Sequence, residues 1–159
     1  LPATPPPPGT STLAPFAPGD VFVGATLLDN PADDHAGRGR ILQFDADLNP
    51  RGVLWTADTT HLVYGLGFAP DSTLWAHDPW AWVTIRVGTD GRQLETLSFH
   101  DRAFSKVHFL PDGNLLFTES LVGDHQPLPL TTRHRPLPGH KTRLGYGFLY
   151  VFTPDLMAL

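Results

Sequence analysis

The sequence has no cysteine and few charged residues, and each shortage excludes a class of function. Without cysteine there is no disulfide, no thiolate metal site and no cysteine nucleophile. Charged residues make up 17% of the 159 residues and the formal net charge is −5, so a nucleic-acid partner, which needs a basic surface, is not expected. No apolar run approaches the roughly 20 residues of a membrane-spanning helix, so no membrane span is expected.

Helical periodicity is missing as well. No segment of ten or so residues repeats its apolar positions at helical spacing, whereas the 17 prolines and 15 glycines are typical of a chain with many tight turns. Residues 1–12 are rich in Pro, Thr and Ser, which predicts an extended linker or arm. Because such segments often follow a removed signal peptide or an anchor, this composition favours an extracytoplasmic location, periplasmic or secreted.

An internal repeat is the main positive signal. Residues 16–22, 68–75 and 109–116 each read as a strand, a Pro-Asp or Pro-Gly turn, and a second strand. Proline presets the backbone for such a turn, and Asp, Gly and Asn tolerate the bend. The last two segments recur at a spacing of roughly 40 residues, which is typical of propeller blades.

A second strand-and-turn motif follows each of these segments, at residues 40–52, 83–91 and 148–155. The repeating unit is therefore a meander of four short strands. We predict an all-β fold, a partial β-propeller of about three four-stranded blades. Its bounds would be about 13–56, 62–99 and 104–159, with a short insertion at 29–38 and a long inserted loop at 119–147. The alternative is a single β-sandwich with coincidental turns.

Two stretches carry a family resemblance, GLGFAPDSTLWAHD at 65–78 and KVHFLPDGNLLFTES at 106–120. They resemble blades of NHL-type propellers and of the SMP-30/gluconolactonase-like group. These families include interaction modules as well as metal-dependent lactonases and phosphotriesterases. The resemblance implies that an enzyme of this group would hold a divalent ion in a central channel with Glu, Asn and Asp ligands. Glu119 is the acid that could serve here, and no Asn partner is apparent.

Three blades are too few for a closed ring, which typically has about four to eight. An open stack would expose an apolar sheet face at each end. We therefore expect something to complete the ring. It could be a second copy associating head to tail as a homo-oligomer, a different partner chain, or the remainder of a longer protein.

The connections on one side of the predicted ring are chemically rich. Residues 33–35 form an Asp-Asp-His cluster, and His77-Asp78 and His100-Asp101 are adjacent pairs. If the protein were an enzyme, these two pairs would supply the catalytic groups, because histidine with a carboxylate is a common general base. His77, Asp78 and Glu119 would be the candidate metal ligands, for Ca or Zn. Otherwise these side chains structure turns and no cofactor is predicted.

Partner or ligand contacts are expected from two further places. Trp80 lies in the predicted 77–81 connection and Trp82 directly follows it, and exposed tryptophan there can stack on a sugar or anchor a protein. Trp75 is expected to pack between blades. The 119–147 insertion suits a partner-binding arm or a lid over the channel. Its basic candidates are His125, Arg133, His134, Arg135 and His140.

Three functions are consistent with these features. The first is a non-catalytic propeller segment for protein assembly or recognition. The second is a metal-dependent hydrolase of the lactonase-like kind. The third is a carbohydrate-binding propeller centred on Trp80 and Trp82.

Overall fold

The computed structural model describes residues 4–99, 102–119 and 149–156, and those residues form an all-β fold. This confirms the all-β prediction. Within these ranges the chain has no helix, and so none that could cross a membrane. Nearly all of the predicted 119–147 insertion lies outside the described residues, as do His100 and Asp101.

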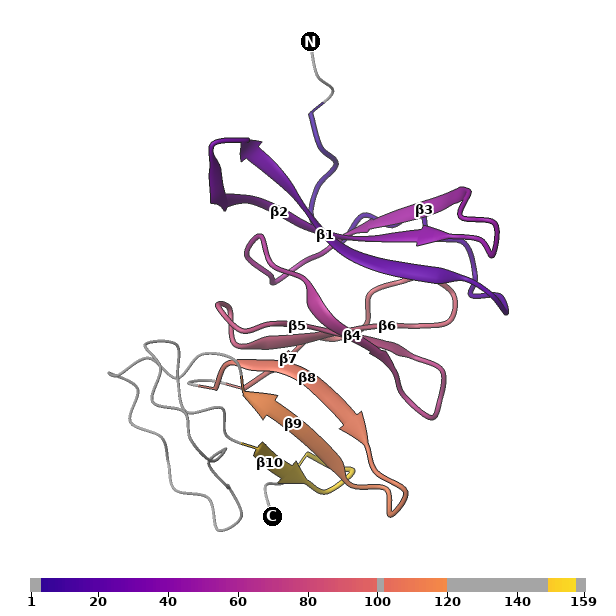
Figure 1. Cartoon of the computed structure of the whole chain (residues 1–159), viewed down its shortest axis with the longest axis vertical. Coiled ribbons are helices and arrows are strands. Elements are labelled where there is room, and N and C mark those ends of the chain that lie inside the picture. The colour runs from indigo at the N-terminus through magenta and orange to yellow at the C-terminus, as the bar shows by residue number, and fades with distance from the viewer. Residues whose placement is uncertain (1–3, 100–101, 120–148, 157–159) are drawn as a thin grey trace.

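In the described part of the chain, ten strands form three antiparallel sheets, and strands that are neighbours in a sheet are also neighbours in the sequence (Figure 1). The first sheet contains β1 (Val21–Asn30), β2 (Asp33–Phe44) and β3 (Pro50–Trp55). The second contains β4 (Tyr64–Phe68), β5 (Leu74–Asp78), β6 (Val83–Val87) and β7 (Leu97–Ser98). The third contains β8 (Phe104–Phe109), β9 (Leu115–Glu119) and β10 (Leu149–Phe152).

The predicted turns are present and share one geometry. In the hairpins at 69–73, 88–92 and 110–114, the first residue donates its N–H to the fifth, and the fourth donates back to the first. The fourth residue has a positive φ in each case, +68° at Ser72, +82° at Gly91 and +87° at Gly113. The 45–49 turn repeats the pattern with Leu48 at φ +64°. Type I turns followed by a left-handed residue are a standard short connection between antiparallel strands.

The three sheets stack on one another, with the second sheet in the middle (Figure 1). We call the face that a sheet turns toward the preceding sheet in the chain its N-side face, and the opposite one its C-side face. For the first sheet the N-side face is the one turned away from the second. One apolar core lies between the first and second sheets, and another between the second and third. Strand β5 is buried along its whole length because it is covered on both sides.

Side chains alternate between the two faces of a strand, and the N-side faces are consistently apolar. The second sheet presents Leu74, Ala76, Ile85 and Val87 to the first. The third presents Phe104, Leu115, Phe117, Tyr150 and Phe152 to the second. The C-side face of the second sheet is mixed instead, and carries Trp75, His77, Thr84 and Arg86.

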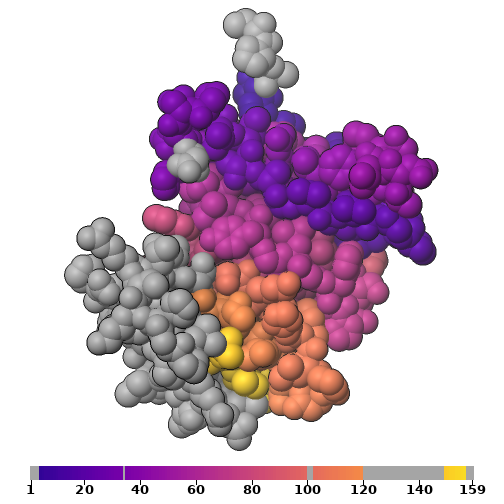
Figure 2. All heavy atoms as spheres, in the orientation of Figure 1, coloured from indigo at the N-terminus to yellow at the C-terminus, as the bar shows by residue number. Residues whose placement is uncertain are grey.

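The first sheet follows the same rule, but no sheet formed by the described residues covers its N-side face. Ile41 and Leu54 point into the core, so Val23, Leu42 and Val53, which pair across the strands, lie on the opposite face. Val21 and Val23 are 38% and 41% exposed. This sheet forms one end of the described molecule in Figure 2. An apolar sheet face is therefore left open to solvent.

Two segments differ from the sequence-based expectation. The expected 29–38 insertion is the far end of the long β1–β2 hairpin, so most of it is strand. The end of the Pro-rich segment lies beside β3, where Gly9 donates its N–H to the Trp55 carbonyl at 2.6 Å and Thr12 donates to Val53 at 2.8 Å. It adds a bonded edge to the first sheet.

Candidate functional site

His77 and Asp78 lie within β5, not in a connection, and consecutive residues of a strand point to opposite faces. His77 points toward the third sheet, where its ring centroid is 6.1 Å from that of Phe117. Asp78 points the other way, toward Thr60. The two side chains therefore do not act together as a pair.

The Asp78 carboxylate is fully buried and holds two connections in place. It accepts hydrogen bonds from the Thr60 N–H at 2.6 Å and the Thr60 hydroxyl at 2.7 Å. It also accepts from the N–H groups of Trp80 at 2.9 Å and Ala81 at 3.2 Å. Its contacts are those of a structural anchor for the 57–61 connection and the β5–β6 turn.

His77 is also fully buried, and its Nδ1 is 2.7 Å from the Thr84 hydroxyl on the neighbouring strand. Burial lowers its pKa to about 3, because a charged imidazole would lose its hydration between the sheets. The ring is therefore neutral at ordinary pH. Glu119, at the end of β9, is buried as well, and its neighbour on the same face, Phe117, contacts His77.

Among the described residues there is no group of three or more His, Asp or Glu side chains that could hold a metal ion. Seven of the predicted site residues lie outside the described ranges. They are His100, Asp101, His125, Arg133, His134, Arg135 and His140.

Three residues of the chemically rich connections do come together. The His35 ring centroid lies 6.3 Å from that of His61 and 6.5 Å from that of Trp80. Trp80 is 57% exposed and Trp82 is 38% exposed. The two aromatic candidates of the β5–β6 turn are therefore on the surface, and Trp80 forms a rim with two histidines from other segments.

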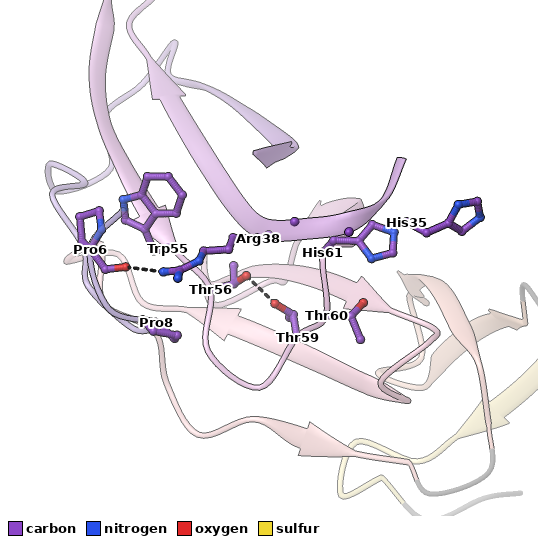
Figure 3. A pocket seen from close by; sticks show the side chains of 12 residues that line it. Pro6, Pro8, His35, Arg38, Trp55, Thr56, Thr59, Thr60 and His61 are labelled. Atoms are coloured by element: carbon purple, nitrogen blue, oxygen red, sulfur yellow. Dashed lines mark hydrogen bonds between the residues drawn. The ribbon is translucent and has the colours of Figure 1, made fainter. Parts of the chain in front are cut away.

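A cavity of about 500 Å³ opens beside this rim, where β2 continues beyond the end of β3 (Figure 3). One wall is the flank of β2, the second is the 55–61 segment, and the third is the N-terminal Pro-rich segment. The lining residues with polar or aromatic side chains are His35, Arg38, Trp55, Thr56, Thr59, Thr60 and His61. Arg38 donates to the Pro6 carbonyl at 3.4 Å, and the hydroxyls of Thr56 and Thr59 are 2.6 Å apart.

The 56–61 wall of the cavity is fastened at both ends and in its middle. Thr56 donates its N–H to Gly39 at 3.1 Å, and the Gln93 amide bonds both the N–H and the carbonyl of Ala57. Besides the Asp78 contacts, the Thr26 hydroxyl donates to the His61 carbonyl at 2.6 Å. The wall is therefore held in place without a ligand.

Gly39 shows how closely this wall approaches the sheet. A Cβ at that position would lie 2.7 Å from the Thr56 hydroxyl and 2.7 Å from a methyl group of Val63. These are shorter than any tolerated contact, so only glycine lets the 56–61 segment pack against β2 here.

Sequence reasoning identified Trp80 and the cluster containing His35, but it missed Arg38, Trp55 and the threonines. The available signal was Trp55-Thr56 standing at the end of a strand, directly before a polar connection. The sequence could not show that β2 continues beyond the end of β3, which leaves the cavity between β2 and the following segment.

Comparisons with known proteins leave the family open. No protein-family model and no curated protein matches the sequence. Among solved structures, a protein of unknown function from Bacteroides caccae is similar at 10% identity, over 91% of this chain and 67% of that one, with a TM-score of 0.43. A TM-score this low supports no argument about fold or function.

Proposed function

We propose that the chain is a non-catalytic β-propeller segment of the NHL or SMP-30-like kind, which acts in protein assembly and recognition. The proposal rests on one observation, the open N-side face of the first sheet. The equivalent faces of the second and third sheets are apolar and are buried by a preceding sheet. The first sheet has the same kind of face, with Val21 and Val23 more than a third exposed.

The partner that best fits this face is a second copy of the chain, joined head to tail. Between the second and third sheets, an apolar N-side face is covered by a more mixed C-side face, whereas the first sheet covers the second with apolar residues such as Ile41 and Leu54. The third sheet offers a C-side face of that mixed kind, with Lys106, His108, Leu116, Thr118 and Val151 among its residues. Placing it on the first sheet of the next copy would continue the stack and, if the rotation closes, complete a ring.

Solution mass tests this proposal. The wild-type chain should have a solution mass of two or more times 17.4 kDa, the mass of one chain. Val23→Lys should shift it toward the single-chain mass, because a charge then replaces an apolar contact at the interface. Leu94→Lys is the matched control, since Leu94 is 40% exposed but lies outside this face. A soluble, folded wild-type monomer contradicts the proposal, and a mass that Val23→Lys leaves unchanged places the interface elsewhere.

A second candidate function is carbohydrate binding at the rim. The observation that favours it is Trp80, which is 57% exposed and lies beside the ring of His35, one of the residues that line the cavity. Exposed tryptophan next to polar groups is suited to stacking on a sugar ring. Trp80→Ala should abolish glycan binding, and Phe68→Ala, at an exposed aromatic residue away from the rim, should not. Binding that survives Trp80→Ala removes the basis of this candidate.

A further inference from the structure

We propose that the cavity beside β2 binds a saccharide that carries a carboxylate, with Arg38 as the partner of that carboxylate. The proposal extends the carbohydrate candidate by naming a ligand class and an anchoring residue. It does not depend on the assembly of the sheets.

The charged residues that line the cavity indicate the charge of the ligand that it would bind. The cavity is lined by one arginine and two histidines, and no Asp or Glu is among its lining residues, although the chain carries a net charge of −5. Three carboxylates of neighbouring segments make other contacts: Asp58 accepts from Thr96 at 2.8 Å, Asp78 accepts from Thr60, and Asp33 lies 3.7 Å from His35. Arg38 is therefore the fixed charge of the lining, and it favours a negatively charged group on the ligand.

Arg38 is the side chain best placed to receive it. A guanidinium has five N–H donors in a planar fork that matches a carboxylate. Within the described residues, its hydrogen bond is the 3.4 Å contact with the Pro6 carbonyl, which is longer than an ordinary N–H···O bond. Figure 3 shows Arg38 between Trp55 and the Thr56–Thr59 pair. Most of its donors are left for a ligand.

The rest of the wall suits hydroxyl groups. The Thr56 and Thr59 hydroxyls bond to each other at 2.6 Å, and a pair of hydroxyls keeps one donor and further lone pairs to offer outward. The volume of about 500 Å³ lies within the range of small-molecule sites, roughly 300–1,000 Å³. Beside His35 of the lining, Trp80 offers an exposed aromatic surface for an adjoining sugar ring. A simple inorganic anion could use the arginine and a hydroxyl donor, but it would neither fill the cavity nor stack on Trp80.

Binding should also need little reorganisation. The 56–61 wall is held by hydrogen bonds to Gly39, Gln93, Asp78 and Thr26. A site that is ordered before binding loses less conformational entropy when the ligand arrives. The 56–61 wall is therefore already in place to receive a ligand.

The test uses the full chain and two matched probes, a galacturonate disaccharide and the corresponding neutral galactose disaccharide, titrated by calorimetry. The acidic probe should bind at least about tenfold more tightly, as expected for a charge-assisted contact. Arg38→Gln should remove this preference, and Arg38→Lys should keep part of it. Arg92→Gln is the control, since Arg92 is a highly exposed arginine in the 88–92 turn and does not line the cavity.

Several results would overturn the inference. It fails if the two disaccharides bind equally, or if Arg38→Gln keeps the preference. It also fails if acetate or inorganic phosphate binds as tightly as the acidic disaccharide, which would make the cavity a general anion site. Neutral-sugar binding that is lost in Trp80→Ala, without preference for the acid, overturns this inference but supports the broader carbohydrate candidate. If neither sugar binds, both fail.

Discussion

The first and second sheets are both antiparallel meanders that share one turn geometry, but they differ in what covers their faces. The second sheet lies between two others, and both of its faces are buried, including His77 and Asp78. The first sheet has one buried face and one open face, on which Val23 is 41% exposed. The comparison shows the same apolar N-side face in all three sheets, covered by a preceding sheet in two of them and open in the first. Under the proposed function, a second copy of the chain covers the open face.

The largest expected effect is the difference in lost stability between truncating a covered apolar residue and truncating an uncovered one. Ile85→Ala, in the second sheet, should lower the free energy of unfolding by about 2–5 kcal/mol, since Ile85 is fully buried and the change leaves a cavity. Val23→Ala should cost less than about 1 kcal/mol when measured at a dilution where copies do not associate. Urea denaturation gives both values. Equal losses would mean that the first sheet is already covered within one chain.

Asp78 gives the next largest effect. Asp78→Ala should cost about 3 kcal/mol, because it leaves the Thr60 hydroxyl and the N–H groups of Thr60, Trp80 and Ala81 without their buried, charged acceptor. It should also weaken any ligand binding in the cavity, since the 56–61 wall is then released. Asp90→Ala, at an exposed turn of the same sheet, should cost less than about 1 kcal/mol. Thermal denaturation of the two variants would show the difference, and similar losses would contradict the anchoring role.

The buried His77 of the second sheet should make the stability of the chain depend on pH. Its pKa is about 3 in the folded chain and near its usual 6.5 when unfolded, so only the unfolded state takes up this proton between those values. Its contribution to stability is complete above pH 6.5 and is lost as pH falls toward 3, by at most about 1.4 kcal/mol per pH unit.

Urea midpoints measured from pH 7 to pH 4 test this dependence. His77→Gln should flatten the slope, whereas His108→Gln, at an exposed residue of the third sheet, should not. A wild-type slope that His77→Gln leaves unchanged would show that His77 is solvated in the folded chain.

The smallest effect concerns the turns that all three sheets share. Leu48 has φ +64° and is 65% exposed, at the position where the 88–92 and 110–114 hairpins have glycine. Leu48→Gly should raise stability by about 0.5–1 kcal/mol, because the left-handed backbone is strained for any residue with a Cβ. Gly113→Ala should lower it by a similar amount. Melting temperatures that move in the same direction in both variants would contradict a common turn geometry.

Local chemistry explains why the strands and turns could be predicted from sequence. Pro-Asp-Gly and Thr-Asp-Gly segments fix a turn by themselves, as the bonds at 88–92 and 110–114 show. Residues 29–38 misled the prediction, because a polar, Asp-rich segment that contains Pro31 and Gly37 reads as a loop, while here it pairs along a long hairpin. The burial of His77 and Asp78 could not be seen either, since it comes from two covering sheets and not from neighbours in the chain.

Engineered cysteines test the central claim most directly, because the chain has none of its own. Val23→Cys marks the open N-side face of the first sheet, and His108→Cys marks the C-side face of the third. Mixing the two single variants under mild oxidation should give a disulfide-linked pair joining one of each. Failure of any mixed pair to form, or exclusive linking of Val23→Cys to itself, would contradict head-to-tail covering of the first sheet.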